Sequence, residues 1–178
     1  MSNLSGHEIP SHSELSYNGN NRTLTINYDH SLGHFENTET LECVLSQYAD
    51  FTEKVVFRIN FPEPQTSLRY NIPTFGVSYT TNYGPINQSE NLQRIADLVR
   101  VLKENFRRLS TVEIVFRLTD YDFDQLSCAA PFFDLPRRCP WNFKYSCGRC
   151  EYGRYITVSP GEILYSQLKS LNDSGSYY

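Results

Sequence analysis

Apolar and polar residues alternate in several short stretches of this chain, and each such stretch predicts a half-buried β-strand. Between residues 22 and 28, Leu24, Ile26 and Tyr28 alternate with polar residues, so that one face of the stretch is apolar. The same alternation recurs at residues 54–61, 75–79 and 112–118. We therefore expect a strand at each of these positions.

Two further stretches repeat apolar residues at every third or fourth position, which is the spacing of an amphipathic helix. The first stretch runs from Leu41 to Tyr48, with Asn37 or Thr38 as candidate N-caps, and the second runs from about residue 90 to 108. Basic residues near the end of the second stretch suit the negative end of a helix dipole. The resulting order is βαββαβ, which is typical of a ferredoxin-like core with an antiparallel sheet and helices on one face. The pattern thus predicts the α+β class.

The rest of the chain completes this picture. Residues 154–158 predict a C-terminal strand, and the capping-box pattern that begins at Ser159 predicts a helix through Leu171. Residues 120–153 contain several Pro and Cys residues and predict an irregular loop. The expected organisation is a flexible arm (1–21), a single domain (22–171) and a frayed tail (172–178).

Composition and charge narrow the class of protein. The 39% of hydrophobic residues is enough for a packed core, so that disorder is disfavoured. The net charge of −4 is modest, and the chain as a whole does not attract nucleic acid or membranes. No apolar run has the length of a transmembrane helix, and the first residues lack the apolar core of a secretory signal. We expect a soluble cytoplasmic or nuclear protein without a membrane partner.

Four of the five cysteines lie near the C-terminus with the spacing C-x10-C-x7-C-x2-C. They are Cys128, Cys139, Cys147 and Cys150. The last two form a C-x2-C pair with a glycine inside, which is one half of a structural zinc site. The first two are too far apart in sequence to form the other half. Zinc is therefore retained as an alternative cofactor, and reduced thiols without a ligand are favoured.

The cysteine segment also reverses the charge of the acidic chain. Between residues 128 and 158, five basic residues are balanced by only two acidic ones. Arginine beside aromatic rings can clamp anions or stack on bases. We predict a binding surface made of Arg137, Arg138, Trp141, Lys144, Arg149 and Arg154. This footprint is small for nucleic-acid binding, so a protein partner is favoured.

Signatures of catalysis are missing from the sequence, which has no P-loop, no G-x-S-x-G elbow and no H-E-x-x-H motif. An enzyme is therefore disfavoured. The predicted function is a non-catalytic protein-interaction module that presents residues 120–153 to its partner. Two alternatives stay open: a zinc-stabilised regulatory protein that contacts an anionic partner, and a secreted, disulfide-bonded effector-like protein.

Two stretches resemble a group of known proteins. VVFRINFP (55–62) and LQRIADLVRVLKENFRRLSTVEIVFRL (92–118) are similar to uncharacterised α+β regions of filamentous-fungal proteins, some of which follow an F-box. No F-box helix bundle precedes them in this chain. The resemblance implies a binding scaffold rather than an enzyme, and it assigns no site residues.

Overall fold

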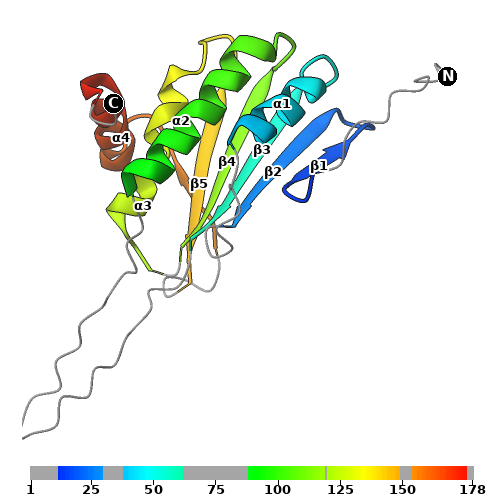
Figure 1. Ribbon diagram of the computed structural model, residues 1–178. Coiled ribbons are helices and arrows are strands. Elements are labelled where there is room, and N and C mark those ends of the chain that lie inside the picture. The colour runs from blue at the N-terminus through cyan, green and yellow to red at the C-terminus, as the bar shows by residue number, and fades with distance from the viewer. Residues whose placement is uncertain (1–11, 30–37, 62–87, 119, 149–153, 176–178) are drawn as a thin grey trace, which may run out of the picture.

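A computed structural model describes residues 12–29, 38–61, 88–118, 120–148 and 154–175 (Figure 1). The described residues form a β-sheet with helices packed against one face. The strands are β1 (Leu15–Asn18), β2 (Thr23–Asp29), β3 (Lys54–Asn60), β4 (Thr111–Leu118), β5 (Trp141–Cys147) and β6 (Ile156–Val158). The helical elements are α1 (Thr38–Tyr48), α2 (Gln88–Asn105), α3 (Phe123–Ser127), the 3-10 helix η2 (Ala130–Asp134) and α4 (Ile163–Ser174).

The sheet is mixed, with neighbouring strands in the order β1-β2-β3-β4-β5-β6. The four central strands, β2 to β5, are parallel, and the two short edge strands are antiparallel to their neighbours. The predicted α+β class is confirmed, but the predicted antiparallel sheet is wrong. The reason is that a helical segment lies between each pair of successive central strands. Each such segment returns the chain to the end of the sheet at which the next parallel strand begins. The predicted strand at 75–79 lies outside the described residues.

The helices lie together on one face of the sheet (Figure 1). This follows from the strand order, because each new parallel strand from β3 to β5 is added at the same edge of the sheet. Right-handed crossovers that advance in one direction place all their helices on one face. Parallel strands normally have helices on both faces. In this chain no described helix lies on the second face, which is therefore the unusual feature of the fold.

The core lies between the sheet and the helices. Alternate residues of β2, β3 and β4 point into it, as their sequence pattern predicts. Aromatic rings connect the strands at one end of this core: Phe116 lies 5.3 Å from Phe61 and 4.9 Å from Phe143, measured between ring centroids. Leu98, Val99 and Leu102 supply the buried face of α2, among others.

The predicted irregular loop at 120–153 is wrong for most of its length. It contains α3, η2 and the whole of β5. Phe132 of η2 is fully buried, and Trp141 of β5 packs against Phe133 and Tyr165 with ring centroids 4.8 and 6.2 Å apart. Much of this segment is therefore core rather than exposed loop.

The two ends of the chain also differ from expectation. β1 lies within the predicted flexible arm and pairs with β2 from Leu15 to Asn18. The last helix begins at Ile163 instead of following Ser159, because Gly161 has a φ of 101° that no helix accommodates. It continues to Ser174, beyond the predicted start of the frayed tail, and ends at Gly175 in the left-handed conformation.

Candidate functional site

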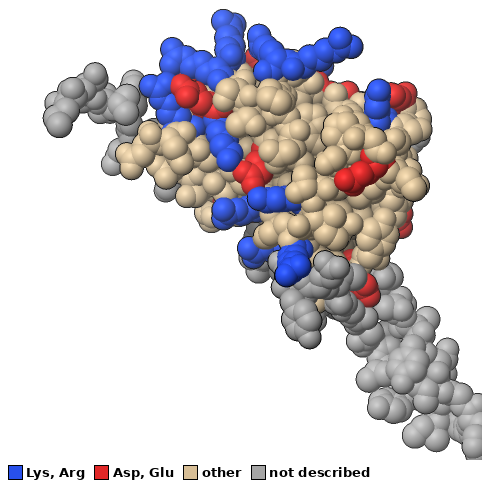
Figure 2. All heavy atoms as spheres, turned by 180° about the vertical axis from the view of Figure 1, so that it is seen from behind, with Lys and Arg blue, Asp and Glu red and all other residues tan. Residues whose placement is uncertain are grey.

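The face of the sheet opposite the helices carries polar side chains from several strands. A shallow depression of about 550 Å³ lies on it. Figure 2 views the molecule from behind the sheet and shows Lys and Arg side chains gathered over its middle and along its upper edge. We call this surface the open face; its residues that matter below are Thr25, Lys54, Val56, Arg58, Glu113, Val115, Arg117, Lys144 and Tyr155.

The open face has a positive charge, although the whole chain is acidic. Four cationic side chains and one anionic side chain line the depression. The anion is Glu113, whose carboxylate accepts from Lys144 and lies 2.9 Å from the Lys54 ammonium. These two hydrogen bonds, with that of Lys144 the stronger, hold the pKa of Glu113 below its ordinary value against the opposing effect of burial.

Replacing Glu113 with glutamine should reduce stability at every pH above the ordinary pKa of the glutamate carboxyl, and not in strong acid. We expect Glu113→Gln to lower the free energy of unfolding by about 1 kcal/mol or less, because both ion pairs are partly exposed. The folded pKa lies below the unfolded value of about 4.3. The stabilisation is therefore complete above the unfolded pKa and is lost as the pH falls through the folded pKa. Urea unfolding across the acid range measures this effect.

The exposed Glu104 of α2 supplies the control for this measurement. Wild type and Glu113→Gln should converge in stability as the pH falls, whereas Glu104→Gln should follow wild type throughout. If Glu113→Gln and Glu104→Gln show the same pH dependence, the Glu113 ion pairs contribute nothing to stability.

Two arginines lie beside this ion-pair cluster without a carboxylate partner among the described residues. Arg58 on β3 is exposed and makes no hydrogen bond or ion pair there. Arg117 on β4 donates from Nε to the Tyr155 hydroxyl at 3.2 Å. The ring of the same tyrosine lies 5.3 Å from the Lys144 ammonium. Tyr155 thus connects two cations, and the open face offers charged hydrogen-bond donors to an anion.

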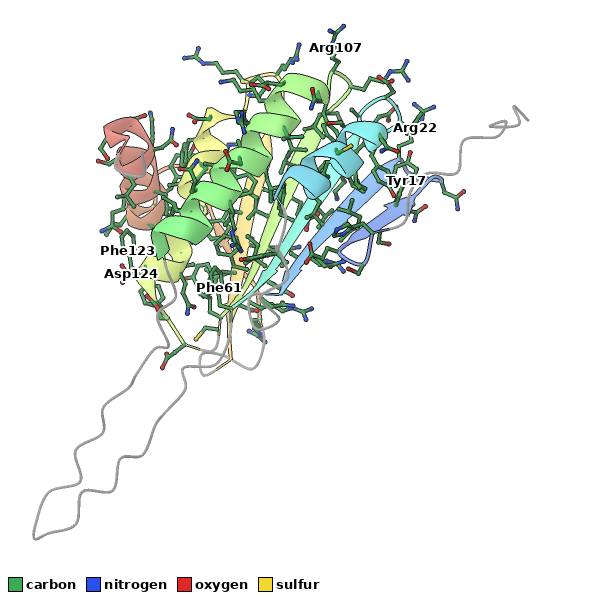
Figure 3. All side chains as sticks on the ribbon, viewed as in Figure 1. Tyr17, Arg22, Phe61, Arg107, Phe123 and Asp124 are labelled. Carbon is green, nitrogen blue, oxygen red and sulfur yellow. The ribbon has the colours of Figure 1, made fainter. Side chains whose placement is uncertain are left out.

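A second basic region lies at the edge where the parallel strands begin. The loop after α2 and the loop before β5 are adjacent there, because the Val112 amide donates to the Pro140 carbonyl at 3.1 Å. Figure 3 shows Arg107 at this edge, and Phe61 at the opposite one. The exposed arginines of these two loops are Arg107, Arg108, Arg137 and Arg138.

The structure divides the predicted binding surface instead of bringing it together. Trp141 and Lys144 belong to the same strand, but Trp141 faces the helices and Lys144 lies on the open face. Strand geometry separates them, because residues three apart point to opposite faces. Of the other predicted residues, Arg137 and Arg138 lie in the second basic region, and the exposed Arg154 precedes Tyr155. Arg149 lies outside the described residues.

The predicted zinc ligands are not available as an exposed group. Cys128, Cys139 and Cys147 are buried, and the described part of the chain contains no cluster of three His, Cys, Asp or Glu residues that could hold a metal ion. Burial raises the pKa of Cys128 to about 12, so this thiol stays protonated at neutral pH and is a poor ligand and nucleophile. Cys150 lies outside the described residues, and the complete four-cysteine site stays a prediction.

The sequence prediction missed most of the open face. Arg58, Glu113, Arg117 and Tyr155 were not among the predicted site residues. Their signal is present in the sequence, because Arg58, Glu113 and Arg117 occupy the polar positions of alternating strands. These residues can be recognised as one site only when the strand order and the register are known.

The chain was compared with models of protein families, with curated proteins and with solved structures, and none of the three comparisons gave a match. The resemblance to fungal α+β regions therefore stays a prediction. Among the described residues, no helix combines the length and the apolar character that a membrane crossing requires.

Proposed function

We propose that this protein is a non-catalytic protein-interaction module whose partner docks on the open face. The observation that carries the proposal is a set of four parallel strands whose described helices all lie on one face. Parallel sheets are normally covered on both faces. A partner protein that lies over β2 to β5 would supply the second cover.

The side chains of the open face favour binding over catalysis. The described residues that line the depression are Ser, Asn, Thr, Val and Tyr together with the charged groups, and none of these described residues carries a thiol or an imidazole. Val56 and Val115 also line the depression, although they are only 8% and 6% exposed. The result is a broad polar surface over an apolar floor, which suits a protein partner more than a small substrate.

We also propose that the protein acts in the cytoplasm or the nucleus. Cys128 and Cys139 are buried thiols that form no disulfide. Thiols of this kind suit a reducing compartment.

Charge reversal on the open face tests the proposed function. Affinity purification from the source cells would compare wild type with the double variant Arg58→Glu/Arg117→Glu. The matched control is Lys103→Glu/Lys169→Glu, which makes the same change of charge at exposed positions of α2 and α4. We expect specific proteins to be retained by wild type and control and lost by the open-face variant. Amine-directed cross-links from Lys54 or Lys144 to such a protein would locate it on this surface.

The same captured proteins with all three baits would overturn the proposal. All variants must first give the same unfolding midpoint as wild type, so that loss of binding is not loss of folding. A deletion of residues 137–150 is unsuitable as a test, because it removes the whole of β5, which lies between β4 and β6 in the sheet.

A further inference from the structure

Three cations surround one buried valine on the open face. The strand register places Val115 of β4 directly between Arg58 of β3 and Lys144 of β5. Arg117 follows two residues later on the same strand and on the same face. With strands about 4.8 Å apart and a rise of about 3.3 Å per residue, Arg58 and Arg117 have Cα atoms about 8 Å apart. Arg58 and Lys144, two strands apart, are separated by about 10 Å.

The positive charge of this cluster is only partly neutralised by the described residues. Glu113 pairs with Lys144 and Lys54, which leaves both arginines without a carboxylate. Arg117 uses its Nε for Tyr155, and its two terminal nitrogen atoms have no partner in the part of the chain that the structure describes. Guanidinium groups favour planar oxyanions that accept two parallel hydrogen bonds. Arg58 and Arg117 therefore each offer a site for one such group.

The spacing of the arginines matches an extended acidic peptide. Alternate side chains of an extended chain lie on the same side, about 6.6 Å apart. Two acidic residues separated by one other residue can thus reach Arg58 and Arg117 together. The intervening side chain points away from the sheet, so it does not have to fit the depression.

Nucleic acid fits the same surface less well. Glu113 places a negative charge beside the cations, where it would repel a phosphate backbone. Among the described residues that line the depression Tyr155 is the single aromatic one, and single strands are usually bound by several stacking rings. A short acidic segment needs only Arg58 and Arg117, which have no carboxylate partner among the described residues, and does not have to pass over Glu113.

We infer that Arg58 and Arg117, with Lys144 beside them, form a carboxylate-binding site for an extended acidic segment of the partner, with acidic residues at alternate positions. The inference rests on the proposed function, since it names the chemistry by which the partner is bound. Tyr155 is a positioning residue in this site, because its hydroxyl holds the Arg117 side chain.

Fluorescence anisotropy with a short labelled peptide tests this inference on the full chain. The peptide has glutamate at alternate positions and valine between them, and the matched peptide has glutamine in place of glutamate. We expect the glutamate peptide to bind wild type and the glutamine peptide not to bind. Arg58→Gln and Arg117→Gln should each weaken binding about tenfold, as expected for the loss of a charged hydrogen bond. Lys103→Gln and Lys169→Gln should leave it unchanged.

Several results would overturn the inference. Equal binding of the glutamine peptide, or unchanged affinity of both arginine variants, would show that the arginines do not bind carboxylates. Tighter binding of single-stranded oligothymidine than of the glutamate peptide would assign the site to phosphate instead. If the peptide does not bind while Arg58→Glu/Arg117→Glu still abolishes capture of a partner, the inference fails and the proposed function stands. If neither effect is seen, both fail.

Discussion

Replacing Phe116 with alanine should lower the free energy of unfolding by about 3–5 kcal/mol, which is the usual cost of removing a buried phenyl ring. Phe116 of β4 is fully buried, and its ring packs against those of Phe61, directly after β3, and Phe143 of β5. The truncation removes both edge-to-face contacts and leaves a cavity that the surrounding core fills only in part. Since a domain of this size is stable by only about 5–15 kcal/mol, a large part of the stability would be lost. Urea unfolding followed by circular dichroism measures the effect.

Two control variants show whether the loss of stability comes from the buried ring of Phe116. Phe116→Leu keeps most of the buried volume and should cost much less than the alanine variant. Ile163→Ala removes a side chain that is 78% exposed and should change stability by less than about 0.5 kcal/mol. Equal stability losses for Phe116→Ala and Ile163→Ala would mean that the ring cluster does not hold the central strands together.

The hydrophobic pattern predicts β2, β3 and β4 well because the two faces of these strands meet different environments. In β3, Val55, Phe57 and Ile59 face the helices, and the polar Lys54 and Arg58 lie on the open face. Such alternation is visible without knowledge of the fold. It does not record strand direction, however. The parallel arrangement follows from the helical segments between strands, and the region that separates β3 from α2 lies outside the described residues.

β5 was missed although its own pattern alternates. In Trp141–Cys147 the aromatic and Cys residues face the helices and Asn142, Lys144 and Ser146 lie on the other side. The surrounding Pro and Cys residues are typical of a loop, and their number hides the alternation of this short stretch. The error carried over to the site, because a loop would expose Trp141 and Lys144 on one surface and a strand separates them.

The open face could not be located from the sequence for a different reason. Arg58, Arg117 and Lys144 are far apart along the chain and belong to three strands. They meet only because β3, β4 and β5 are neighbours in a parallel register that places Arg58 and Lys144 on either side of Val115. Proximity in the sequence favours the cysteine segment as the binding site. Proximity in space favours a binding site made of residues from three separate segments.

Replacing Phe132 with alanine should also cost about 3–5 kcal/mol, although Phe132 lies in the segment that the sequence predicted to be an irregular loop. Its ring is fully buried, and its centroid lies 5.0 Å from that of Phe57 in β3. It also lies 6.4 Å from Trp141, the single tryptophan of the chain. Both α2 and α4 pack against η2, so the cavity would loosen the contact between two helices and the sheet. Urea unfolding measures the loss, and Trp141 fluorescence should shift to the red as water reaches the indole.

The matched control comes from the same segment, because Arg137 is exposed and makes no contact with this core. Arg137→Ala should change stability by less than about 0.5 kcal/mol and leave the Trp141 emission unchanged. If Phe132→Ala is as mild as Arg137→Ala, residues 130–134 do not belong to the core and the sequence-based interpretation as a loop is restored. If only Phe132→Ala is destabilising, this segment acts as a structural cover for the helix side of β5, and the search for a partner belongs on the opposite, open face of the sheet.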